Sequence, residues 1–208
     1  ARKSWPVVVR MLLAADADVA AVDKSGQTCL HAATEGAMQP GYWCAARRVG
    51  LVVSELLRAG AVAGARDNRR RTPLHYAAHG GYDTAASLLL TRPPAKQSQT
   101  QRTPTSTCCA APAVAEPPAV DINAADEDKR TALHIATRNG HLRMVALLLS
   151  HGADVTPADR DGQTALHFAV LERQPQMVGL LLDYGAPPAP VNLSGDTPLT
   201  TAVALGDA

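Results

Sequence analysis

The chain has 208 residues, with 20 Lys and Arg against 19 Asp and Glu, so its net charge is +1. A balanced charge and only 3% aromatic residues argue against a nucleic-acid-binding protein. No apolar run reaches the ~18 residues of a membrane-spanning helix, so we expect no membrane contact from this segment. With so few aromatics, the core is expected to consist of Ala, Leu and Val, which suits closely packed helices.

A short phrase, Thr-x-Leu-His or a near variant, recurs along the chain. Its copies begin at Thr28, Thr72, Thr131, Thr164 and Thr197, with spacings of 44, 59, 33 and 33 residues. The first four copies carry a His three positions after the Thr, at His31, His75, His134 and His167. The fifth copy has Thr200 instead. Self-similarity at such a period is the sequence signature of a repeat architecture.

Each copy of the phrase predicts the same local structure. Thr is a favoured N-cap residue, and Pro at the next position suits the start of a helix. Glycines such as Gly81 and Gly140 are expected to end this first helix. A second helix with apolar residues at helical spacing follows, most clearly over residues 144–149, and then a tight hairpin. One such unit cannot bury its apolar face alone, whereas stacked units can.

The pattern resembles the ankyrin repeat. The Thr-Pro-Leu-His phrase at 72–75, the 33-residue period and Gly-Ala-Asp-Val at 152–155 all match that family. The resemblance implies an all-α fold, an ankyrin-repeat solenoid. In this fold helix-turn-helix units with short β-hairpin loops form a right-handed stack.

We expect one array over residues 1–208. It would comprise a partial repeat at 1–22, repeats at 23–66, 67–125, 126–158 and 159–191, and a partial repeat at 192–208. Both ends fall within a repeat and lack the polar outer face of a capping unit. The chain is therefore expected to be a piece of a longer array.

Two insertions interrupt the period. The first, at 37–47, lies between the helices of its repeat and holds Tyr42 and Trp43. It is either an aromatic contact loop for a partner or a longer turn that folds back on its own repeat. The second, at 91–119, is rich in Pro, Ser, Thr and Ala, so we expect it to be disordered. It is either a regulatory segment or a neutral expansion.

The histidines do not indicate a metal site or an enzyme. One His per repeat places neighbours about 10 Å apart, the spacing of packed helices. That is too far for a shared zinc ion, whose bond to a His nitrogen is about 2 Å. The resemblance implies instead a structural clamp, in which each His bonds the Thr of its own phrase and nearby backbone. Because no catalytic motif or phosphate loop occurs, we expect no enzyme activity, no cofactor and no metal.

The resemblance implies a protein–protein interaction scaffold that binds through its hairpin tips and concave face. The candidate contact residues at these positions are Lys24, Asn68, Arg69, Arg70, Arg71, Glu127, Asp128, Arg130, Arg138, Arg160 and Asp161. The tip at residues 66–71 carries a net charge of +3. It either meets an acidic partner or is a solvated turn neutralised by its acidic neighbours.

Three further expectations concern context. Asn123 matches a hairpin asparagine that is a hydroxylation target in some ankyrin proteins, although it also reads as an ordinary turn residue. The cysteines form no disulfide framework, so a cytoplasmic or nuclear protein is expected, and we expect a monomer. The alternative function is the targeting or regulatory array of a larger multidomain enzyme, such as a ligase, a kinase or a lipid-handling enzyme.

Overall fold

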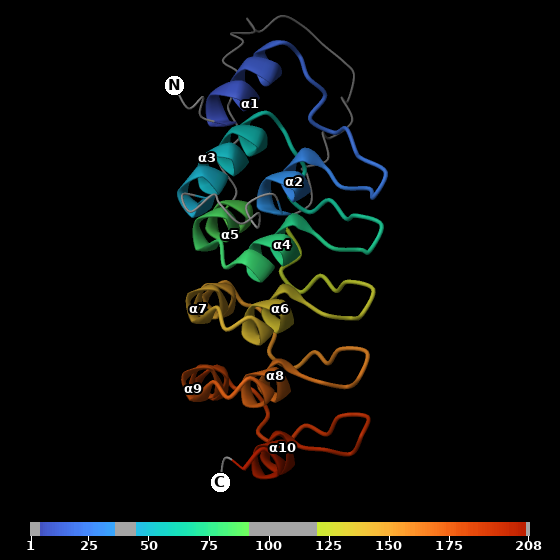
Figure 1. Ribbon diagram of the computed structural model, residues 1–208, viewed down its shortest axis with the longest axis vertical. Coiled ribbons are helices and arrows are strands. Elements are labelled where there is room, and N and C mark those ends of the chain that lie inside the picture. Colours follow the sequence, from blue (N-terminus) through green and yellow to red (C-terminus); the bar gives the residue numbers. More distant parts are fainter. Residues whose placement is uncertain (1–4, 36–44, 92–119, 207–208) are drawn as a thin grey trace, which may run out of the picture.

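A computed structural model describes residues 5–35, 45–91 and 120–206. Within these ranges the helices are α1 (Trp5–Ala14), α2 (Cys29–Glu35), α3 (Ala45–Arg58), α4 (Pro73–Gly80), α5 (Asp83–Leu90), α6 (Ala132–Arg138), α7 (Leu142–Ser150), α8 (Ala165–Leu171), α9 (Pro175–Asp183) and α10 (Pro198–Ala204). The even-numbered helices pack in one layer and the odd-numbered helices in a second (Figure 1). The predicted all-α solenoid is confirmed, whereas its right-handed sense stays a prediction.

The repeated phrase starts each helix of the even-numbered layer. Thr72 and Thr131 have extended backbone at the N-cap of α4 and α6, and Pro73 occupies the first position of α4. Gly81 ends α4 with φ of 66°, in the left-handed region that glycine adopts without steric strain. The local signals therefore set where these helices begin and end.

The core lies between the two layers. The Leu of each of the first four phrases is at most 3% exposed: Leu30, Leu74, Leu133 and Leu166. The odd-numbered helices oppose them with buried aliphatic side chains such as Val53 and Leu148, and Ala pairs such as Ala77 and Ala78 allow close packing. Burying a Leu or Val side chain contributes roughly 1.5–3 kcal/mol, so the stack is held mainly by apolar contact between successive units.

Hairpins project from the even-numbered layer and line up along one edge (Figure 1). In the described residues their only strand-like pairings are two isolated bridges, Val22 with Thr28 and Ala158 with Thr164. Each hairpin is closed by backbone bonds at its base, for example from Asp126 N–H to the Arg130 carbonyl at 2.9 Å. The loops are therefore short turns rather than sheet strands.

The first insertion differs from its predicted limits. Residues 45–47 were expected in the loop between two helices, but they form the first turn of α3. Their Ala-Ala-Arg sequence has high helix propensity, so the helix extends toward its N-terminus and reaches 14 residues. Residues 36–44, with Tyr42 and Trp43, and most of the second insertion, residues 92–119, lie outside the described residues.

The described helices are all short. None of them combines the length and the apolar character that crossing a membrane requires.

Candidate functional site

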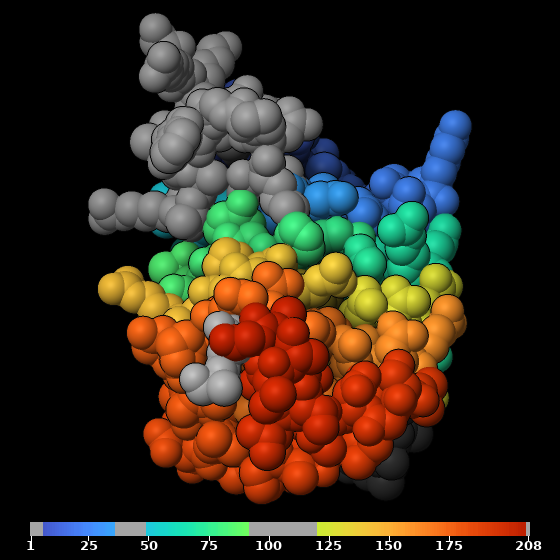
Figure 2. All heavy atoms as spheres, turned by 60° about the horizontal axis from the view of Figure 1, so that its bottom comes forward, coloured from blue at the N-terminus to red at the C-terminus, as the bar shows by residue number. Residues whose placement is uncertain are grey.

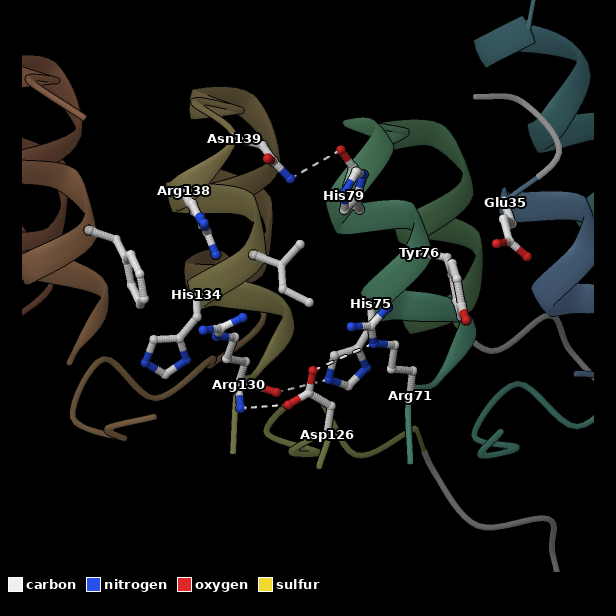
Figure 3. A pocket seen from close by; sticks show the side chains of 12 residues that line it. Glu35, Arg71, His75, Tyr76, His79, Asp126, Arg130, His134, Arg138 and Asn139 are labelled. Atoms are coloured by element: carbon white, nitrogen blue, oxygen red, sulfur yellow. Dashed lines mark hydrogen bonds and ion pairs between the residues drawn. The ribbon is translucent and has the colours of Figure 1, made fainter. Parts of the chain in front are cut away.

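A groove of about 500 Å³ crosses α4 and α6 and reaches α2 at one end and α8 at the other (Figure 3). We call it the inner groove. Its lining residues are Glu35, Arg71, His75, Tyr76, His79, Asp126, Arg130, His134, Ile135, Arg138, Asn139 and Phe168. Arg71 and Arg130 approach from the hairpin side, and His79 and Arg138 stand at the opposite ends of α4 and α6. The groove is therefore mainly polar, with Ile135 partly exposed in it and with Tyr76 and Phe168 only 8% and 6% exposed.

The histidine of each phrase is fixed at both ring nitrogens. His75 Nδ1 accepts a hydrogen bond from the backbone N–H of Thr72 at 3.0 Å and lies 2.9 Å from Thr72 Oγ1. Because a backbone N–H only donates, Nδ1 is the unprotonated nitrogen, and the ring is neutral with its proton on Nε2. His75 Nε2 then donates to the carbonyl oxygen of Arg130 in the next unit, at 3.1 Å. The ring thus links two neighbouring units.

The other three histidines make the same kind of link. The carbonyl oxygens that their Nε2 atoms reach belong to Arg71 for His31, Pro157 for His134 and Asp196 for His167. Burial lowers the pKa of His31, His75 and His134, because a charged imidazolium is poorly solvated inside the stack. With both nitrogens bonded, these rings are structural and have no free position for a metal ion or a substrate.

Each hairpin turns around the acid or amide that stands five residues before the phrase. Asp126 Oδ1 accepts backbone N–H bonds from Asp128 and Arg130 at 2.9 and 2.8 Å. Asp23, Asp67, Asp159 and Asn192 accept the corresponding pair of bonds in their own hairpins. These side chains therefore fix the shape of the tips.

The second oxygen of two of these carboxylates meets an arginine of the preceding unit. Arg71 Nε lies 3.6 Å from Asp126 Oδ2, and Arg130 Nε lies 3.4 Å from Asp159 Oδ2. The two carboxylate side chains are only 2% and 1% exposed, whereas the arginine side chains are 29% and 26% exposed. The negative charges are therefore buried and the positive charges face the groove.

Tyr76 forms a rigid part of the groove. Its hydroxyl donates to Asp67 Oδ2 at 2.7 Å and accepts from Gln27 Nε2 at 3.0 Å. Burial, followed by the hydrogen bond to the Asp67 carboxylate, raises the pKa of Tyr76 to about 12, so the phenol stays protonated at neutral pH. Its ring meets His31 edge-on, with centroids 5.8 Å apart. Phe168 meets His134 in the same way at 6.0 Å.

Most of the predicted contact residues are exposed along the hairpin tips and the ends of the first helices. The exposed ones are Lys24, Asn68, Arg69, Arg70, Glu127, Arg138, Arg160 and Asp161. Successive tips are joined by backbone bonds, such as Glu127 N–H to the Arg69 carbonyl at 3.1 Å, so they form one continuous edge. Within the described part of the chain Arg69 and Arg70 make no ion pair, whereas Arg160 Nη1 lies 3.6 Å from Asp128 Oδ1.

The structure brings some predicted residues together and leaves others apart. Arg71, Arg130 and Arg138 all line the inner groove, Arg138 on the wall opposite the other two. The exposed tip residues line the hairpin edge beside the groove. Asn123 is also exposed, and its Oδ1 accepts the backbone N–H of Asp154 at 2.9 Å. Its hydroxylation stays a prediction.

Sequence reasoning missed the apolar residues that line the groove. Tyr76, Ile135 and Phe168 each follow the His of their phrase by one position. The sequence does distinguish this position, because its residue type differs from unit to unit while the residues on either side of it repeat.

Among the described residues no group of three or more His, Cys, Asp or Glu side chains is arranged to hold a metal ion. The lining of the groove offers cations, hydrogen-bond donors and some apolar surface.

Comparison with known families supports the interpretation of the repeated phrase as part of an ankyrin repeat. A family model described as ankyrin repeats (three copies) matches residues 111–192, and a model of a single ankyrin repeat matches residues 69–96. Together these matches span just over half of the chain. No curated protein matches the sequence.

Proposed function

The chain belongs to the ankyrin-repeat family, and from that premise we propose that it is a non-enzymatic scaffold that binds a partner protein. Ankyrin repeats are generally protein-interaction modules, and such domains are typically non-catalytic. The proposed contact surface is the hairpin edge together with the inner groove.

One observation carries the proposal. The groove places the partly exposed Ile135 beside Arg71 and Arg130, each of which is paired with a buried carboxylate. Arginine is one of the residue types that are enriched at binding hot spots. The exposed charges of the neighbouring tips would add orientation and on-rate rather than most of the affinity.

The chemistry of the histidines supports a non-enzymatic role. The four rings that recur in the phrase are neutral and hydrogen-bonded at both nitrogens, so they are not placed to transfer protons. No observation on the described residues favours the array of a larger enzyme over a simple scaffold. We further propose that the chain acts as a monomer in the cytoplasm or nucleus.

The test is capture of partners from a lysate followed by mass spectrometry, with three baits. The first is the native chain, and the second carries Arg69→Glu and Arg70→Glu on the exposed tip. Arg71 is left unchanged, because a carboxylate there would face the buried Asp126 and destabilise the fold. The third, Arg143→Glu, alters an exposed arginine of α7 on the other layer and is the control for a charge reversal away from the tips.

We expect at least one protein to be captured by the native chain and the control and lost by the tip variant. Folding of each bait is checked by circular dichroism. Partners that all three baits retain would rule out the tip, and the absence of any specific partner would contradict the proposed function.

A further inference from the structure

We propose that the inner groove binds an extended peptide in a polyproline-II-like conformation, with two carboxylates three residues apart and an apolar side chain between them. This inference rests on the proposed scaffold function and deepens it by naming the chemistry of the partner. It is carried by the distribution of charge, the spacing of the arginines and the position of the apolar residues.

The first step is the charge that a ligand would meet. Arg71 and Arg130 are each paired with a carboxylate that is at most 2% exposed, so a ligand would contact the guanidinium groups and not these two acids. Arg130 also lies 3.8 Å from Asp128, whose side chain is 42% exposed, so within the described ranges Arg71 is the one of the two with no exposed acid paired to it. Arg138, exposed at the opposite wall, has no ion pair among the described residues and adds a third positive charge. The exposed acid in the lining, Glu35, stands at the α2 end of the groove. The centre of the groove therefore favours an anionic ligand.

The second step is hydrogen-bonding capacity. Arg71 makes no side-chain hydrogen bond within the described residues, and its contact with Asp126 is an ion pair at 3.6 Å. Arg130 uses Nε for Asp159, and Nη1 lies 3.8 Å from Asp128 Oδ2. Both guanidinium groups thus keep donors for a carboxylate, and guanidinium–carboxylate bonds are among the stronger hydrogen bonds in proteins.

The third step is spacing. Arg71 and Arg130 precede the N-caps of α4 and α6, two helices packed side by side in one layer. Packed helices lie about 8–10 Å apart. A polyproline-II segment has three residues per turn and rises ~3.1 Å per residue, so residues three apart project from one face at about 9 Å. This spacing matches one carboxylate to each arginine.

The fourth step concerns the residues between the carboxylates. A polyproline-II helix presents three faces, so an intervening side chain points away from the arginine wall. Ile135 lines the groove and is partly exposed, whereas Tyr76 beside it in the lining is only 8% exposed. An apolar side chain between the two acids would pack against Ile135.

Other units of the chain show which uncharged residue can replace these two arginines. Gln27 and Gln163 occupy the position of Arg71 and Arg130 in the units on either side. Arg71→Gln and Arg130→Gln therefore place a residue that this hairpin already accepts elsewhere and remove one positive charge each. Arg143→Gln on α7 is the control for loss of charge outside the groove.

The experiment is fluorescence polarisation with a labelled probe peptide that contains Glu-Pro-Leu-Glu. One control peptide has both Glu changed to Gln, and a second keeps the composition but places the two Glu side by side. We expect the spaced peptide to bind about tenfold more tightly than the amide peptide, as the loss of charge-assisted bonds implies. It should also bind more tightly than the side-by-side isomer.

Two further probe peptides, each with only one Glu changed to Gln, are then combined with the protein variants in a double-mutant cycle. Arg71→Gln should couple with one carboxylate and Arg130→Gln with the other, while Arg143→Gln should couple with neither. Equal binding of the three peptides, or no coupling with either groove arginine, would overturn the inference. A native chain that captures partner proteins yet binds the spaced probe no better than the amide probe would refute this inference alone and leave the scaffold function standing.

Discussion

At the scale of a single residue, the histidine of the phrase stabilises the stack by linking two units. Changing His75 to Ala removes a buried ring and leaves the Thr72 N–H and the Arg130 carbonyl without their partner. We expect the free energy of unfolding to fall by roughly 3 kcal/mol, from the cavity and the unsatisfied groups together. The measurement is urea denaturation followed by circular dichroism. His79→Ala, an exposed histidine of the same helix, should change stability by no more than about 0.5 kcal/mol, and similar losses for both would contradict the clamp.

The same histidines predict how stability depends on pH. Burial lowers the pKa of His31, His75 and His134 in the folded state, whereas the unfolded chain keeps the ordinary value of about 6.5. Above that pH the rings are neutral in both states and stability is complete. As the pH falls below it, the unfolded state takes up protons first, so stability decreases by up to about 1.4 kcal/mol per pH unit for each histidine.

Urea midpoints between pH 8 and pH 5 measure this dependence. A His134→Gln variant should show a shallower decline than the native chain, because one of the three titrating groups is gone. A native midpoint that stays constant from pH 7 to pH 5 would mean that these rings accept protons inside the fold.

At the scale of an element, each hairpin tip is set by backbone geometry. Gly162 has φ of +77°, and a Cβ placed there would lie 2.8 Å from the backbone N of Leu193 in the next hairpin. Gly195 has φ of +86° with nothing within 4 Å of such a Cβ. A non-glycine residue in this region costs roughly 1–2 kcal/mol. We therefore expect both Gly→Ala variants to lower the melting temperature, and Gly162→Ala to lower it further.

Thermal unfolding followed by circular dichroism separates the two causes. Gly195→Ala reports the conformational cost alone, and the excess for Gly162→Ala reports contact between neighbouring tips. Arg70 and Lys129 already adopt φ of 60° and 59° at the equivalent position, so the fold tolerates the conformational cost alone. Equal losses in the two variants would show that the tips do not press on one another.

The elements also show what the sequence could and could not predict. The Thr N-caps, the turn glycines and the apolar spacing are local signals, so they predicted the helices and hairpins. The start of α3 at Ala45 was missed because the limits of an insertion are set by packing as well as by local signals. The pairing of Arg71 with Asp126 joins residues 55 positions apart and depends on the register of the stack. The resemblance marked Arg71 as a surface contact, and the stack makes it half-buried as well.

At the scale of the whole molecule, stability comes from contact between neighbours. The helices α4, α6 and α8 each pack on the even-numbered helices before and after them and on their own partner in the other layer. The histidine bonds and the tip-to-tip bonds likewise join adjacent units. In such a quasi-one-dimensional fold, the stability of a unit depends on how many neighbours cover it.

This dependence predicts different protection of α6 and α10 from hydrogen exchange. Both begin with the same phrase, but α6 is covered by α4, α7 and α8, whereas α10 packs mainly on α8. Leu199 and Val203 of α10 are 71% and 60% exposed, and the C-terminal residues form the front face in Figure 2. Hydrogen exchange with mass spectrometry should therefore show α10 opening with a small free energy and α6 only with near-global unfolding. Protection of α10 equal to that of α6, and rising with protein concentration, would instead mean that a second molecule covers this face, contrary to the proposed monomer.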